Sequence, residues 1–267
     1  MVTDADVAAG LRKLGLSGAE AEVHASFRSF GGVEKGVASV VAALKRELRT
    51  ILVPTFCWDA LAPALEDIGR NAWSNEGFVA EHPSPPRAFD PLTSPIDADM
   101  GVIAKTISAD PLSRRSSHPL CSWAARGEDA DGLVANHDWE YPALPINRLM
   151  ERNGSILLVG VTLTSCTAIH LAEEVAGRKM FIRWAVDSSG RVRPARTGGC
   201  SDGFDRLLPR LDGVFREVRV GESRLLAASL PELVARAARI IREDPGVTMC
   251  ERKCDRCVSA VAGGPVA

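Results

Sequence analysis

Three residues about two thirds of the way along the sequence have the types and spacing needed for acid–base chemistry: His170, Glu173 and Glu174. At positions i, i+3 and i+4 of a helix, both carboxylates lie on the same side as the imidazole. An imidazole accepts a proton near neutral pH, and a neighbouring carboxylate can orient its ring. The spacing therefore indicates a general base. The alternatives are a solvated helix face and a zinc-hydrolase pair of His170 and Glu174.

The predicted helix that carries these residues, Ala168–Ala176, follows a continuous apolar run at Ile156–Val161. Such a run is typical of a strand that is covered on both faces. Thr164 and Ser165 offer side-chain oxygens for the helix N-cap. Ligands of open α/β sheets bind where strands end and helices begin, so this junction is the expected place for a site.

A second strand-to-helix junction is predicted nearer the N-terminus. A strand at Ala21–Ala25 is followed by the Gly- and Ser-rich segment Ser26–Gly36, a helix at Val37–Leu48 and a strand at Thr50–Val53. Backbone amides of such a loop can bind a phosphate. The loop has neither Walker nor Rossmann spacing, so ATP and nicotinamide sites are not supported. The alternative is a plain connection.

The remaining pattern predicts one α/β domain over residues 1–267, because no Pro/Gly linker divides it. A Pro-rich insertion covers about residues 71–95, and a Cys-rich tail covers 246–267. Carboxylates at Asp90, Asp97 and Asp99 would suit a cationic substrate. The other expected elements are helices at 7–14, 100–108, 127–136, 144–152, 204–211 and 231–244, a strand at 120–125, a hairpin at 181–194 and a strand at 215–220.

Composition excludes several classes of protein. The net charge is −2 and no long basic run is present, which argues against nucleic acid as a partner. No segment has the apolar length of a membrane span. The first residues are acidic where a signal peptide would be basic. We therefore expect a cytoplasmic location.

The seven cysteines are an odd number, which argues against a disulfide framework. Cys250, Cys254 and Cys257 have the close spacing of thiolates that bind zinc or an iron–sulfur cluster. Cys200 is the best candidate for a fourth ligand. Structural zinc, a cluster and free thiols are the three alternatives.

Several segments resemble, in this order, the aminoglycoside 3-N-acetyltransferases, also called antibiotic N-acetyltransferases. They are Val23–Val33, Val53–Phe56, Arg115–Pro119, Ser122–Ala125, Gly160–Val161 and Thr167–Glu174. The resemblance covers roughly residues 7–245. It implies a central mixed sheet flanked by helices, distinct from the GNAT fold, with acetyl-CoA as the co-substrate and direct transfer to an aminoglycoside or related amine. A non-catalytic relative that only binds CoA is an alternative.

The resemblance also implies roles for individual residues. His170 is the expected general base, with Glu173 as the carboxylate that holds its ring. Asp90 and Glu174 are expected to bind a cationic acceptor. The predicted CoA contacts are Ser26, Arg28, Ser29, Gly31, Gly32, Val33, Arg115, Ser116 and His118.

Two points of the chemistry stay open in the sequence. Cys166 lies four residues before the expected base, so an acyl-cysteine route is an alternative to direct transfer. Lys105 occupies a position where family members commonly have an acid, and a cation facing the acceptor would disfavour a polycationic aminoglycoside. A homodimer is an open alternative for the oligomeric state.

Overall fold

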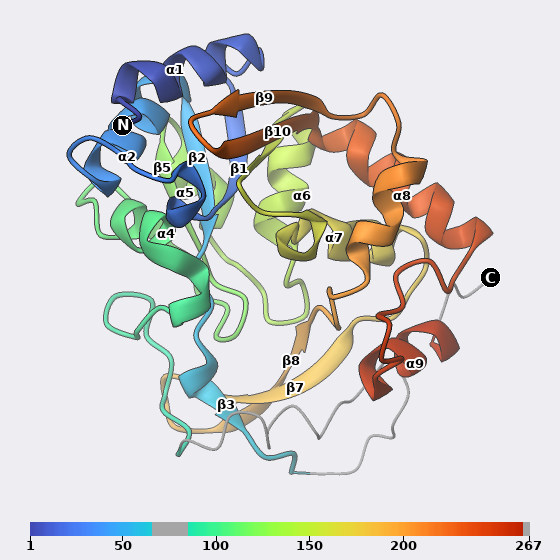
Figure 1. Cartoon of the computed structure of the whole chain (residues 1–267). Helices are drawn as coiled ribbons and strands as arrows, with labels where there is room; N and C mark the ends of the chain where they lie inside the picture. Colours follow the sequence, from blue (N-terminus) through green and yellow to red (C-terminus); the bar gives the residue numbers. More distant parts are fainter. Residues whose placement is uncertain (66–84, 264–267) are drawn as a thin grey trace.

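A computed structural model describes residues 1–65 and 85–263. Its core is a seven-stranded mixed sheet with the order β4-β5-β2-β1-β6-β10-β9 (Figure 1). The strands are β1 (Glu20–Ala25), β2 (Thr50–Pro54), β4 (Arg114–Arg115), β5 (Trp123–Gly127), β6 (Ser155–Val159), β9 (Arg216–Val220) and β10 (Ser223–Ser229). The three central strands β2, β1 and β6 are parallel, and the flanking pairs are antiparallel.

Helices cover both faces of this sheet. They are α1 (Asp4–Lys13), α2 (Val37–Glu47), α4 (Gly101–Ser108), α5 (Ala130–Val134), α6 (Leu144–Glu151), α7 (Ala168–Val175) and α8 (Leu230–Glu243). Alternate residues of a strand point to opposite faces. In β6, Leu157 and Val159 pack with α1, α2 and α4, whereas Ile156 and Leu158 pack with α6, α7 and α8. The apolar run therefore forms a strand that is buried on both sides, as predicted.

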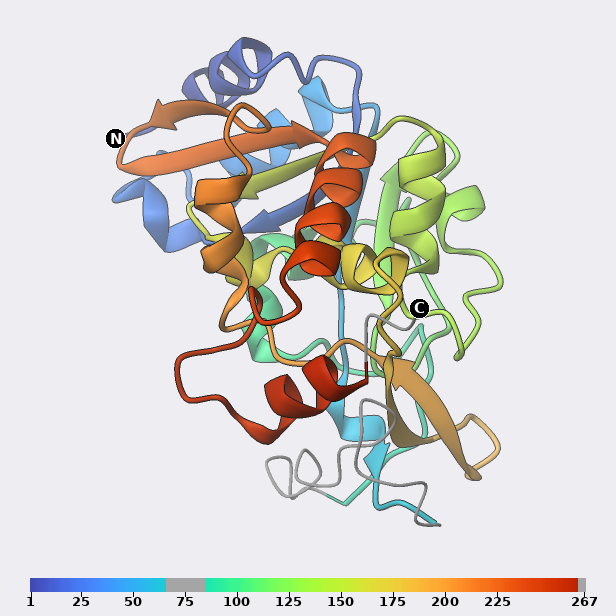
Figure 2. The ribbon, with the colours of Figure 1, turned by 90° about the vertical axis from the view of Figure 1, so that its right-hand side faces the viewer.

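A small three-stranded sheet lies beyond the carboxyl ends of the parallel strands (Figures 1 and 2). It consists of β3 (Leu61–Ala62), β7 (Phe181–Val186) and β8 (Val192–Thr197), and β7 and β8 form the predicted hairpin. The short helix α9 (Asp255–Ala262) lies at the same end of the molecule. These pieces enclose the end of the central sheet at which ligands of α/β proteins bind.

The predicted α/β fold with a central mixed sheet is confirmed. The sequence analysis missed β10, which forms a hairpin with β9 across Gly221 and Glu222, and it missed α9. The predicted helix at 204–211 is a 3-10 helix, Phe204–Arg210, with Pro209 inside it. Residues 71–84 of the predicted insertion lie outside the described residues. Within those residues, no helix combines the length and apolarity that a membrane crossing requires.

Candidate active site

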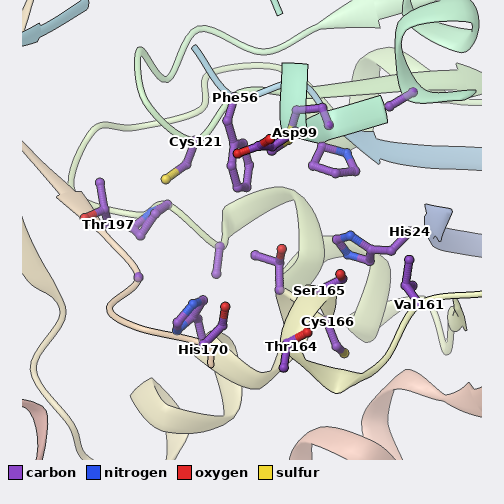
Figure 3. Close-up of a pocket in the computed structure, with 18 of the residues that line it drawn as sticks. His24, Phe56, Asp99, Cys121, Val161, Thr164, Ser165, Cys166, His170 and Thr197 are labelled. Atoms are coloured by element: carbon purple, nitrogen blue, oxygen red, sulfur yellow. The ribbon is translucent and has the colours of Figure 1, made fainter. Parts of the chain in front are cut away.

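A cavity of about 420 Å³ opens at the carboxyl ends of β1, β2 and β6 (Figure 3). One wall comes from the connection between β6 and α7, and the opposite wall comes from the start of α4. Its size lies in the range of small-molecule sites. The polar side chains on its surface are those of His24, Asp99, Cys121, Thr164, Ser165, Cys166, Thr167, His170, Thr197 and Ser201.

His170 lines this cavity from the first turn of α7. Its Nδ1 is 2.7 Å from Oε2 of Glu173, so the predicted pairing of imidazole and carboxylate is present. An ionised carboxylate only accepts hydrogen bonds, so Nδ1 is the donor, and in the neutral ring Nε2 carries the lone pair. Among the described residues, no hydrogen bond occupies Nε2. The pair therefore presents a proton acceptor to the cavity.

Two neighbours fix the plane of the His170 ring. Phe204 packs against it edge to face, with ring centroids 4.9 Å apart. Gly198 lies against the ring so closely that a Cβ at this position would be 2.4 Å from Cδ2 of His170. Only glycine leaves room for the imidazole there. The ring therefore depends on two segments that follow α7 in the sequence.

The junction before α7 differs from the prediction. A 3-10 turn, Leu163–Ser165, separates β6 from the helix, so the chain does not pass directly from strand to helix. The N-cap residue of α7 is Thr167, which makes no side-chain capping bond. Thr162 instead accepts from the amide of Thr164 and caps the 3-10 turn. Thr164 and Ser165 consequently face the cavity, and their predicted capping role is wrong.

A second histidine–carboxylate pair, which the sequence analysis missed, lies at the same cavity. His24 lines the cavity, and its Nε2 is 2.7 Å from Oε1 of Glu22 in the interior of β1. Figure 3 shows His24 and His170 with the connection through Ser165 between them. Residues i and i+2 of a strand share a face, so a glutamate two residues before a histidine was the available signal.

Cys166 also lines the cavity, but its side chain is almost fully buried. Burial raises the pKa of its thiol well above the ordinary value, and the charge of Glu22 raises it further. The reactive form of a cysteine is the thiolate. Cys166 is therefore held in its unreactive form.

The predicted CoA loop is folded against the β9–β10 hairpin. Ser29 donates to the carbonyl of Ser26 at 2.7 Å and shares a 2.8 Å bond with Ser223. The Glu222 carboxyl is so close to Gly31 that a Cβ there would be 2.6 Å from it. A carboxylate beside this turn would repel the negative charge of a phosphate. The following predicted contacts do not line the cavity, and their role stays a prediction: Ser26, Arg28, Ser29, Gly31, Gly32 and Val33.

Arg115 was predicted to contact CoA, but it holds segments of this chain together. Its guanidinium donates to the Thr55 carbonyl at 2.6 Å and to the Ser94 carbonyl at 2.5 Å, and it stacks 5.1 Å from the centroid of Phe89. Its Nε also reaches the Thr55 hydroxyl at 3.2 Å. These bonds tie the described part of the predicted insertion to the end of β2.

Ser116 and His118, two further predicted contacts, are fully buried. Ser116 Oγ accepts from the amide of Trp123 and lies 2.9 Å from Nδ1 of His137. His118 Nδ1 accepts from the amide of Cys121 at 3.0 Å. Burial lowers the pKa of His118 well below 6.5 and that of His137 to about 4. Ser116, His118 and His137 therefore form a buried, uncharged polar cluster in the core, which we call the polar knot.

Asp90 and Glu174, the carboxylates that the resemblance assigns to the acceptor, do not line the cavity, whereas Asp99, also expected to suit a cationic substrate, does. Asp90 accepts from the amide of Leu92 and the hydroxyl of Thr93, and so caps its own turn. Glu174 is largely buried, and burial raises its pKa. Asp99 is the carboxylate that lines the cavity, at its exposed edge. Lys105 does not line the cavity, so the expected conflict between its charge and a cationic acceptor loses its geometric basis.

The structure brings together the four predicted metal ligands Cys200, Cys250, Cys254 and Cys257. Their sulfurs all lie within 4.8 Å of one another. The amide of Cys250 donates to the sulfur of Cys257, and the amide of Cys254 donates to that of Cys250. The latter bond is the main cause that lowers the pKa of Cys250 to about 7. The group therefore has the donor set and compactness that a tetrahedral thiolate site requires.

Known proteins with related sequences are aminoglycoside acetyltransferases. Aminoglycoside N(3)-acetyltransferase VII of Streptomyces paromomycinus is 32% identical over 181 residues, 66% of this chain and 61% of that protein. Aminoglycoside N(3)-acetyltransferase III of Salmonella sp is 32% identical over 210 residues, 72% of this chain and 68% of that protein. The matched segment thus spans about two thirds of these relatives.

Solved structures agree with the fold. The apoenzyme of aminoglycoside acetyltransferase AAC(3)-IVa superimposes with a TM-score of 0.78 at 26% identity over 98% of both chains. AAC-IIIb, solved as a binary complex with CoASH, has a TM-score of 0.71 at 24% identity over 90% of this chain and 96% of its own. A model of the aminoglycoside 3-N-acetyltransferase family matches residues 23–242, well over half of the sequence. The chain belongs to the aminoglycoside 3-N-acetyltransferase family.

Proposed function

We propose that this protein is an acetyl-CoA-dependent N-acetyltransferase in which His170 is the general base. The observation that carries the proposal is the imidazole at the cavity wall, with Nδ1 bonded to Glu173 and, among the described residues, no hydrogen bond to Nε2. The acceptor nitrogen attacks the thioester carbonyl carbon, and the carbon–sulfur bond breaks. The proton lost by the nitrogen passes to Nε2 and then to the departing sulfur of CoA.

A base is needed because most amines are protonated at neutral pH and attack only as the free amine. A correctly placed general base contributes about a hundredfold to ten-thousandfold in rate. Glu173 keeps a proton on Nδ1, so the ring accepts the proton of the amine at Nε2. This division of roles between two ring nitrogens is what a histidine–carboxylate pair supplies.

Direct transfer is favoured over an acyl-cysteine intermediate. Cys166 is the thiol nearest to the base in the sequence, and it lines the cavity. Its raised pKa keeps it protonated, and a thiol in that state is a poor nucleophile. The acceptor amine therefore attacks the acetyl group of acetyl-CoA itself.

We propose an aminoglycoside or a related amine as the acceptor. The related enzymes carry aminoglycosides in their names, and a histidine-to-alanine variant of AAC(3)-IVa was solved in complex with apramycin. In this chain, Asp99 offers a carboxylate to a cationic acceptor at the cavity edge. Arg28, which is exposed on the loop after β1, is our candidate for the phosphates of CoA.

We further propose that Cys200, Cys250, Cys254 and Cys257 hold a structural zinc ion. Tetrahedral ligation with Zn–S bonds of about 2.3 Å needs sulfurs about 3.8 Å apart, which the compact group allows. When bound, zinc would supply a crosslink between the segment after β8 and the C-terminal helix. Metal analysis of the purified protein tests this, and a zinc content near zero would refute it.

A zinc hydrolase that uses His170 and Glu174 is not supported. Within residues 1–65 and 85–263, the four cysteines form the only group of potential ligands with the required proximity. Nδ1 of His170 is already bonded to Glu173, and Glu174 does not line the cavity.

The decisive experiment measures free thiol released from acetyl-CoA with a panel of aminoglycosides and simpler amines. We expect amine-dependent release that is lost in His170→Ala, while calorimetry shows that this variant still binds acetyl-CoA. Undiminished turnover in His170→Ala would overturn the proposal. Acetyl-CoA binding without release for any amine would instead indicate a non-catalytic relative. We place the activity in the cytoplasm, and sedimentation of the purified protein would test for a homodimer.

A further inference from the structure

The carboxylate of Glu173 is held at both oxygens. Oε2 faces Nδ1 of His170, whereas Oε1 is 2.5 Å from Nη1 of Arg178. Arg178 lies three residues after the last residue of α7 and five residues after the glutamate, so its side chain reaches back to the helix. The carboxylate is thus clamped between the ring that it orients and a guanidinium behind it.

Arg178 is itself fixed in the protein interior. Its side chain is only 2% exposed, and Nη1 also donates to the Thr248 hydroxyl at 2.6 Å. Nη2 donates to the Pro245 carbonyl. A buried charge is costly unless an opposite charge and hydrogen bonds compensate it. Within the described residues, Glu173 is the only carboxylate that forms an ion pair with Arg178.

The anchors of Arg178 belong to a segment that is far away in the sequence. Pro245 and Thr248 follow α8 and lead directly into Cys250. The backbone of this segment packs closely on Gly203, where a Cβ would be 2.3 Å from the Thr248 carbonyl. The guanidinium is therefore bonded to a segment whose backbone is packed against Gly203.

We propose that Arg178 is a positioning residue for the reaction, acting through Glu173 on His170; this rests on the proposed role of His170 as the base. A glutamate side chain has several rotatable bonds and loses conformational freedom when it is held in one orientation. Because Arg178 holds Oε1, the other oxygen is already aimed at Nδ1 before substrates bind. Catalytic groups must be held close to their productive geometry, and a neighbour that locks the rotamer provides this.

The first test compares Arg178→Gln with Arg178→Lys. We expect Arg178→Gln to lower kcat about tenfold to a hundredfold with little change in KM for either substrate, by analogy with the residues that orient metal-ligating histidines. Arg178→Lys keeps a cation and should recover most of the loss. Arg242→Gln is the matched control, because Arg242 also donates to α7, at the Val175 carbonyl, but is exposed on α8. It should retain the wild-type kcat.

The second test separates positioning from a merely structural role. In a Glu173→Gln background, Arg178→Gln should cost almost nothing further in kcat, because the residue through which it acts is already altered. The same multiplicative loss in both backgrounds would overturn the proposal. If Arg178→Gln does not fold, Thr248→Val removes one anchor and should show a smaller loss with the same dependence on Glu173. Full activity of His170→Ala would refute the base itself, whereas an inactive His170→Ala with additive losses would refute only the role of Arg178.

Discussion

Two groups of histidines in this molecule differ in the residues and the space that surround them. His170 lines the cavity and has a carboxylate partner on Nδ1. His118 and His137 lie 4.9 Å apart between ring centroids, are buried, and bond to backbone amides, a serine and a carbonyl. Of these three histidines, His170 is the one that lines the cavity. The polar knot of Ser116, His118 and His137 is buried in the core, and the CoA contacts expected of Ser116 and His118 stay a prediction.

The largest expected effect tests this comparison directly. His170→Ala should lower kcat about a hundredfold to ten-thousandfold, because the proposed general base is lost, with little change in melting temperature. His118→Ala should lower the melting temperature with little change in kcat, because it leaves a cavity and unpaired amides in the core. Steady-state kinetics and thermal unfolding of both variants provide the measurement. If both variants lost kcat to a similar extent and kept their melting temperature, the distinction between the two groups of histidines would be wrong.

Acid should destabilise the protein through the polar knot. The pKa of His137 is about 4 in the fold against an ordinary value near 6.5, so the unfolded chain binds more protons between these pH values. Stability is therefore full above pH 6.5 and declines as the pH falls toward 4, by about 3 kcal/mol for this residue. The lowered pKa of His118 acts in the same direction.

Urea unfolding at pH 7, 6 and 5 measures this decline. His137→Gln removes the titrating group, so its free energy of unfolding should fall less steeply with acid than that of the wild type. An equal slope in both proteins would show that other groups cause the acid sensitivity.

On the catalytic side of the comparison, Gly198→Ala should reduce kcat about a hundredfold. The added methyl group would lie 2.4 Å from Cδ2 of His170 and must displace the ring, and a shift of about 1 Å in a catalytic group can have this effect. Gly190→Ala, in the exposed turn between β7 and β8, is a control with no neighbouring atom near the new Cβ, although its positive φ adds local strain. Wild-type turnover in Gly198→Ala would show that the ring position is not critical.

The smallest effect concerns the hydroxyl at the centre of the polar knot. Ser116→Ala leaves the amide of Trp123 and Nδ1 of His137 without their partner, which should cost about 1–3 kcal/mol of stability. Kinetic constants at saturating acetyl-CoA should stay close to wild type. A large rise in KM for acetyl-CoA at unchanged stability would instead support the CoA contact that the family resemblance implies.

Local patterns predicted the elements and the pairing that depend on neighbouring residues. The buried strand β6 follows from its apolar run, and the contact between His170 and Glu173 follows from i, i+3 spacing on one helix. The strand β10 was missed because Ser223–Ser229 is rich in serine and alanine and shows no strong alternation.

The rest of the site depends on contacts between distant segments. Arg178 meets Thr248 seventy residues away, and nothing in either local sequence indicates the contact. The motif around Arg115 and His118 shows a second difficulty. A family motif marks a residue as needed, but it does not say whether the fold or the reaction needs that residue. Cys200 lies beside the three later cysteines, as predicted. This contact could be predicted because cysteines that can bind one metal ion are recognisable at any separation in the sequence.

The residues that anchor Arg178 behind Glu173 are made late in the synthesis of the chain, and this affects when the enzyme becomes active. Thr248 is synthesised 75 residues after the glutamate. While the ribosome is still adding those residues, β1, β2 and β6 are already available to form the pocket walls, but Arg178 has neither Thr248 nor Pro245 to anchor it behind the carboxylate. The full rate of acetylation should therefore be reached only after the segment beyond α8 has docked.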